Sequence, residues 1–127
     1  MGTIKRFEDI KSWQNARILT QLVYQLSSEE VFSRDFSLKD QIRRSAISIM
    51  SNIAEGFESH TQPLFVKYLG LARASAGELR SQVYIAFDLK YITEKELKKL
   101  LDIAEKVSRQ IFRFVHYLKR QHNPERM

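Results

Sequence analysis

The sequence predicts an all-α protein that folds as an antiparallel, up-down-up-down four-helix bundle. Along four segments, apolar residues return every three or four positions, the spacing that keeps side chains on one face of a helix. Only 4 Gly and 2 Pro occur in 127 residues, too few for the many turns of a β-sandwich or barrel. A chain of this length has room for one hydrophobic core. We therefore expect a single four-helix-bundle domain over residues 1–127.

The first two helices are expected over residues 9–26 and from Ser37 to about Gly56. The first has an apolar face that runs from Trp13 to Leu26, and the serine-containing segment 27–36 is interpreted as a loop. The hydroxyl of Ser37 can accept hydrogen bonds from free backbone N–H groups at a helix start. The second helix has its own apolar face, formed by Leu38, Ile42, Ser45, Ala46, Ile49, Asn52, Ile53 and Gly56.

The third and fourth helices are expected over residues 62–89 and from Thr93 onward. Proline is tolerated in a first helical turn, where its missing N–H would be unpaired anyway, so Pro63 fits the third start. Thr93 and Glu96 are three residues apart, a spacing that lets each side chain bond the other's backbone N–H in a capping box. Asn123 and Pro124 are expected to end the fourth helix. Long helices joined by short connections fold back on one another, which gives the bundle.

Composition limits the classes of function. The formal net charge is +6 and the sequence pI is about 9.7, which favours association with polyanions. The absence of cysteine excludes disulfides and thiolate chemistry and is typical of a reducing compartment, so we expect a cytoplasmic protein. No window has about 20 uninterrupted apolar residues, and no membrane partner is expected. The histidines lack metal-ligand spacing and no glycine-rich phosphate loop is present, so we expect no enzyme, metal or cofactor.

Residues 41–56, with the sequence QIRRSAISIMSNIAEG, resemble the signature of the four-helix-bundle family encoded by intervening sequences in bacterial 23S ribosomal RNA genes. Segments 7–16, 68–79 and 89–92 also resemble the family's pattern, although residues 74–77 depart from it. The resemblance implies a helical bundle that associates, commonly as a ring-like pentamer, without catalytic residues. The sequence is also similar to the accessory proteins of diversity-generating retroelements, basic pentamers, and this implies contact with nucleic acid and a reverse transcriptase.

A basic stripe is predicted on the outer face of the fourth helix, opposite its apolar seam. Its cations recur at steps of three, four and seven residues, and Asp102 is the acidic residue among them. The stripe spans roughly 37 Å at 1.5 Å per residue, enough to follow several phosphates. The alternative is an ordinary solvated face. The predicted nucleic-acid-binding residues are Lys95, Lys99, Lys106, Arg109, Arg113 and Arg120.

Two further features of the sequence predict packing. A small-residue stripe on the third helix is a candidate oligomer interface, because glycine inside a helix costs about 1 kcal/mol relative to alanine and needs a packing reason. A hairpin centred near residue 60 places Arg43 opposite Glu78, so we expect a structural ion pair there, since partly buried charges need partners. The small-residue stripe consists of Gly70, Ala74, Gly77 and Ser81, and Tyr84 extends the candidate oligomer interface.

The sequence favours a non-enzymatic homo-oligomer, with a pentamer as one option, that presents basic helix faces to RNA or DNA. One alternative is a protein-interaction scaffold whose basic surface meets an acidic partner, such as a polymerase or reverse transcriptase. The other is a structural product of a mobile intervening sequence without a dedicated ligand. Phosphate contacts depend strongly on salt, so a salt titration separates the first hypothesis from the other two.

Overall fold

The computed structural model describes residues 4–121, and every regular element in this range is helical. Four long helices make up most of it, and two short helical segments lie near the start of the chain and after the first long helix. The all-helical bundle predicted from the sequence is confirmed. The elements are η1 (Phe7–Asp9), α1 (Lys11–Ser27), α2 (Glu30–Ser33), α3 (Phe36–Glu58), α4 (Gln62–Asp88) and α5 (Glu94–Gln121).

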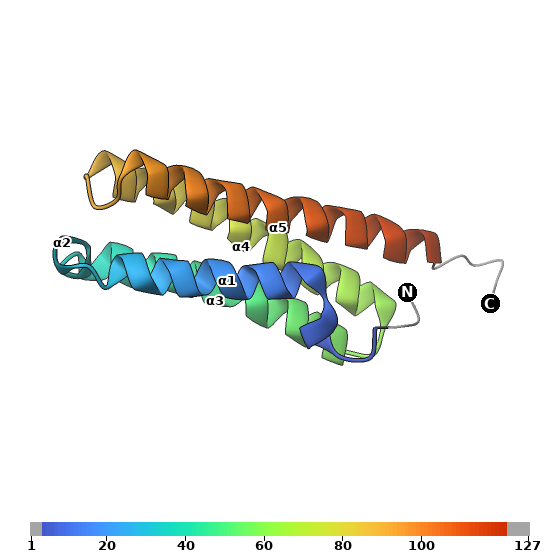
Figure 1. Ribbon diagram of the computed structural model, residues 1–127. Helices are drawn as coiled ribbons and strands as arrows, with labels where there is room; N and C mark the ends of the chain where they lie inside the picture. Colours follow the sequence, from blue (N-terminus) through green and yellow to red (C-terminus); the bar gives the residue numbers. More distant parts are fainter. Residues whose placement is uncertain (1–3, 122–127) are drawn as a thin grey trace.

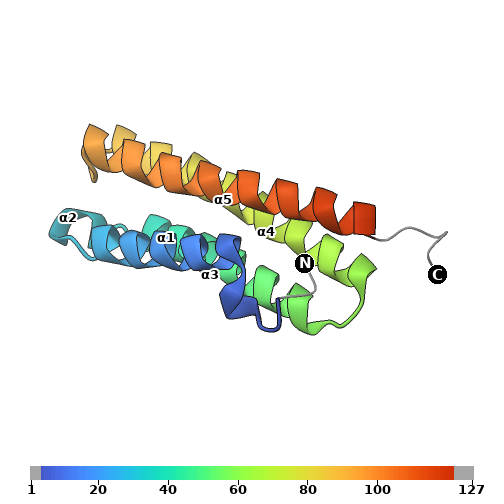
Figure 2. The same ribbon diagram turned by 45° about the vertical axis from the view of Figure 1, so that its right-hand side comes forward.

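Each long helix packs against two others. Contacts join α1 to α3, α3 to α4, α4 to α5 and α5 back to α1, so the four helices enclose one core. Successive long helices run in opposite directions, and the α1–α3 pair faces the α4–α5 pair (Figures 1 and 2). The most extensive pairing is between α3 and α4.

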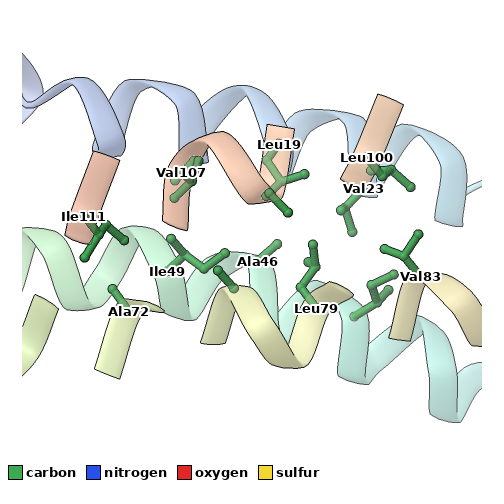
Figure 3. Packing of buried hydrophobic residues seen from close by; sticks show 14 of the residues in the cluster. Leu19, Val23, Ala46, Ile49, Ala72, Leu79, Val83, Leu100, Val107 and Ile111 are labelled. Atoms are coloured by element: carbon green, nitrogen blue, oxygen red, sulfur yellow. The ribbon is translucent and has the colours of Figure 1, made fainter. Parts of the chain in front are cut away.

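The core is formed by apolar side chains that all four long helices direct inward. Figure 3 shows Val23 of α1 near Leu100 of α5, and Ile49 of α3 near Val107 of α5. Alanines at Ala46, Ala72, Ala76 and Ala104 are fully buried. Because an alanine side chain is short, these positions let the helix backbones approach closely. The apolar faces predicted by helical periodicity therefore account for most of the core.

The segment expected to be a loop between the first two long helices contains a short helix instead. This helix, α2, is one turn long and places Phe32, 2% exposed, against the core. The aromatic ring of Phe32 stacks on Tyr91, with 5.2 Å between ring centroids. A segment of four residues is too short to show helical periodicity, which is why the sequence did not reveal it. An isolated helix of one turn is unstable, and the burial of Phe32 stabilises this one.

The start of α3 is capped by Asp35 and not by Ser37, which corrects the sequence prediction. The Asp35 carboxylate accepts a hydrogen bond from the backbone N–H of Leu38 at 3.1 Å. Its second oxygen, Oδ2, accepts a hydrogen bond from the Tyr91 hydroxyl at 3.0 Å. This hydrogen bond to Asp35 raises the pKa of the Tyr91 phenol above its ordinary value. Aspartate is as good an N-cap as serine, and only Asp35 can also bond the α4–α5 connection.

Two other local features fix the helix ends. The capping box at the start of α5 is confirmed, because Thr93 N–H donates to Glu96 Oε1 at 2.8 Å and Glu96 N–H donates to Thr93 Oγ1 at 3.1 Å. Near the end of α3, Gly56 lies against α4. A Cβ atom added at Gly56 would lie 2.7 Å from the Cβ of Tyr68 and 3.0 Å from a ring carbon of Phe65. Asn123 and Pro124, predicted to end the last helix, lie outside the described residues.

Candidate nucleic-acid interface

The basic stripe of α5 lies on the exposed side of the helix. Leu100, Val107 and Ile111 face the core, and this apolar seam turns the opposite side of α5 toward solvent. No carboxylate oxygen of residues 4–121 lies within 4 Å of a side-chain nitrogen of the stripe, so no ion pair of the described chain neutralises it. All six predicted cations are exposed: Lys95, Lys99, Lys106, Arg109, Arg113 and Arg120.

The stripe borders a groove between α4 and α5 that sequence analysis missed. This α4–α5 groove has a volume of about 600 Å³. Two of its arginines, Arg109 and Arg113, belong to the stripe, whereas Arg73 and Arg80 come from α4. Arg73 and Arg80 are seven residues apart and therefore share one side of α4, which is the signal that could have found them. The groove is lined by Arg73, Gly77, Arg80, Glu105, Ser108, Arg109, Phe112 and Arg113.

Two contacts organise the side chains of the groove. The guanidinium carbon of Arg73 lies 4.8 Å from the centroid of the Phe112 ring, within the range of a cation–π interaction. Across the groove, Arg80 Nη2 and Glu105 Oε2 are 3.7 Å apart, a long and partly exposed ion pair that contributes little stability. The Nε of Arg80 is buried and has no hydrogen-bond partner among residues 4–121. The groove therefore retains donors that its own residues do not use.

The small-residue stripe faces away from the rest of the chain. Gly70, Ala74, Gly77, Ser81 and Tyr84 are all exposed. A Cβ added at Gly70 or Gly77 would meet no atom of residues 4–121 within 4 Å. No other helix of this range therefore packs closely against these two glycines. Exposed apolar residues adjoin the stripe on what we call the outer face of α4: Leu64, Leu71, Ile85 and Leu89.

The prediction of an ion pair between Arg43 and Glu78 is wrong, because both side chains have other partners. Ser45 donates to Glu78 Oε1 at 3.0 Å, and the hydroxyls of Ser48 and Ser75 are 2.8 Å apart. The register of the α3–α4 hairpin is thus shifted by two residues from the predicted one. Because two residues correspond to about 200° around a helix, Ser45 facing α4 directs Arg43 away from it.

Arg43 stabilises the C-terminal end of α1 instead. Its Nε donates to Ser27 Oγ at 2.8 Å and its Nη2 donates to Ser28 Oγ at 3.1 Å. The guanidinium carbon also lies 4.3 Å from the centroid of the Tyr24 ring. A cation beside the free carbonyl groups of a helix C-terminus is favourable. The side chain of Arg43 is therefore engaged in the fold, as the sequence analysis had expected, but with different partners.

Within residues 4–121, no group of three or more His, Asp or Glu side chains is placed to hold a metal ion. In the same range, no helix combines the length and the apolar character needed to cross a membrane.

Comparison with known proteins identifies the family. Residues 8–113 match the sequence pattern described as "23S rRNA-intervening sequence protein". The chain belongs to this family. The matched range contains the α4–α5 groove and the stripe as far as Arg113.

A solved structure has the same fold as this member of the intervening sequence family. It is a protein of unknown function from Bacteroides thetaiotaomicron, described as belonging to the S23 ribosomal protein family. The TM-score is 0.76 at 18% sequence identity, with 83% of this chain and 95% of that chain covered. At this identity the likeness concerns the fold alone. No curated protein matches the sequence.

Proposed function

We propose that the protein is a non-enzymatic, cytoplasmic homo-oligomer that binds RNA or DNA through the basic stripe of α5. The observation that carries this proposal is the exposed row of six cations without a carboxylate partner among residues 4–121. Surface lysines and arginines commonly pair with acidic neighbours. A row that stays unpaired over roughly 37 Å of helix presents a continuous positive surface to a phosphate backbone.

The arginines of the groove extend this surface from α5 to α4. Arg73 and Arg80 lie across the groove from Arg109 and Arg113, so the positive charge covers a band wider than one helix. Arginine presents its donors in a planar fork that matches phosphate oxygens. Such contacts fix the position of a nucleic acid and carry little base information.

A salt titration tests the binding proposal. Binding of a fluorescently labelled oligonucleotide, followed by anisotropy, should weaken as salt increases from about 50 to 200 mM. The logarithm of the association constant should fall linearly with the logarithm of salt concentration, because phosphate contacts release counterions. Absence of binding at about 50 mM salt, for RNA and DNA alike, would contradict the proposal and leave an acidic protein, such as a polymerase, as the partner to test.

Self-association is proposed to use the outer face of α4. Leu64, Leu71 and Ile85 are separated by whole heptads and therefore lie in one line along the helix. All three are more than 40% exposed, and Gly70 and Ala74 of the small-residue stripe lie beside them, so a second helix can approach closely there. Assembly through this face would repeat the basic stripe once in every subunit.

The substitution Ile85→Glu should dissociate the oligomer, because it places a charge in the proposed apolar contact. Light scattering of the parent protein at micromolar concentration should give a mass well above 15.0 kDa, and the variant should approach the monomer mass. The matched control is Ile18→Glu on α1, where the isoleucine is 52% exposed against 46% for Ile85. A parent protein that is monomeric, or equal effects of the two substitutions, would refute this interface.

A further inference from the structure

The α4–α5 groove combines unneutralised cations with an exposed aromatic ring. Four arginines and one glutamate line it. Glu105 is 3.7 Å from Arg80, and no carboxylate of residues 4–121 lies within 4 Å of Arg73, Arg109 or Arg113. The charge of the groove is therefore strongly positive. An anionic ligand would supply the acceptors that these guanidinium groups lack.

The aromatic ring of Phe112 lies in the same groove and is 45% exposed. Large apolar side chains on a soluble helix are usually buried, and α5 buries other side chains efficiently, with Val107 and Ile111 fully enclosed. Phe112 also contacts His116, with 4.4 Å between ring centroids, and Arg73 covers part of the ring. The Phe112 and His116 rings meet edge-on, at 60°, so Phe112 offers an exposed aromatic ring beside the cations.

The groove is open to solvent at its α4 edge. Gly77 lines this edge, and a Cβ added there would meet no atom of residues 4–121 within 4 Å. The volume of about 600 Å³ lies within the range of clefts that hold small ligands. A planar group of a ligand can thus lie in the groove beside Gly77.

We propose that the α4–α5 groove binds an unpaired segment of nucleic acid, with phosphates on its arginines and one base stacked on Phe112. This inference rests on the proposed function, in which the same surface contacts phosphates, and it adds a preference for single strands. Cations alone bind paired and unpaired strands. A base within a duplex is already stacked between its neighbours, so only an unpaired base can place its ring on an aromatic side chain.

The experiment compares two probes and three variants. Titrations followed by fluorescence anisotropy use a labelled single-stranded oligonucleotide of about 12 nucleotides and the blunt-ended duplex of the same sequence. The variant Phe112→Leu keeps an apolar side chain and removes the aromatic face, whereas Phe112→Tyr keeps the face. The matched control is Phe36→Leu, because Phe36 is also exposed, at 71%, and also lies near a cation, with Lys39 Nζ 5.7 Å from its ring centroid.

Phe112→Leu should weaken binding of the single strand about tenfold, the loss expected for one stacked base. Binding of the duplex should change by less than roughly twofold, and the salt dependence should stay the same because no charge is removed. Phe112→Tyr and Phe36→Leu should both bind as the parent protein does. Circular dichroism of each variant checks that the helices are retained.

Three outcomes would overturn the inference, and they are distinguishable. If the parent binds both probes and Phe112→Leu binds them equally well, the stacking site is wrong and the proposed function stands. If Phe112→Leu weakens single strand and duplex to the same extent, Phe112 supports the fold of the surface and does not stack on a base. If the parent binds neither probe at low salt, the proposed function fails and the inference fails with it.

Discussion

Replacing Lys106 and Arg113 by glutamate is expected to weaken nucleic-acid binding on the order of a hundredfold at moderate salt, because attraction to phosphates becomes repulsion at two points of the stripe. The slope of log affinity against log salt concentration should decrease in magnitude by about two, roughly one for each phosphate contact that is lost. Both side chains are exposed, while Leu100, Val107 and Ile111 hold α5 in the core. The fold should therefore be retained. Mobility-shift titrations at several salt concentrations measure the change.

The control for this prediction is the double substitution Arg17→Glu and Arg44→Glu. It alters the net charge by the same amount, at exposed positions on α1 and α3. If net charge alone governs binding, the two double variants will lose the same affinity. If the stripe is the interface, the Arg17→Glu and Arg44→Glu double variant will retain most of the parent protein's affinity. A charge-reversed stripe that remains folded and binds as tightly as the parent would show that these cations form an ordinary solvated face.

Gly56→Ala is expected to lower the free energy of unfolding by about 1–3 kcal/mol, the cost of overpacking a tight contact. The added methyl group would lie 2.7 Å from the Cβ of Tyr68, which cannot rotate away because its position is fixed by the α4 backbone. The helices must therefore move apart at this crossing. In an open helical position, the same substitution stabilises a protein by up to about 1 kcal/mol. Denaturation by urea measures the difference.

Gly70→Ala is the matched control for that experiment. Gly70 lies on α4, and a Cβ added there would meet no atom of residues 4–121 within 4 Å. Because Gly70 also belongs to the proposed subunit contact, both glycine substitutions are compared in the Ile85→Glu background, which separates the subunits. Alanine at Gly70 should raise the free energy of unfolding there, so the two substitutions should have opposite signs. Equal stabilisation by both would mean that α3 and α4 are not closely packed at Gly56.

The sequence predicted those parts of the fold that depend on one helix at a time. Helical periodicity identified the buried faces, and the Thr93–Glu96 spacing identified a cap that involves only neighbouring residues. The Asp35 cap was missed because its advantage over Ser37 includes a bond to Tyr91, 56 residues away.

The missed features of the site all depend on how two helices are aligned. Loop length alone placed the α3–α4 register two residues from the observed one, and this error assigned the wrong partner to Arg43. The stripe was predicted because its residues lie on α5 alone. The groove was not, because Arg73 and Arg80 become its second wall only once α4 packs beside α5.

The hydrogen bond between Tyr91 and Asp35 couples two events of local unfolding. Asp35 holds the first turn of α3, and Tyr91 belongs to the connection between α4 and α5. Opening that connection removes one of the two partners of Asp35 and separates Tyr91 from Phe32. We therefore expect fraying at the start of α3 and opening of the α4–α5 turn to share part of their free-energy cost, which would make this end of the bundle one cooperative unit.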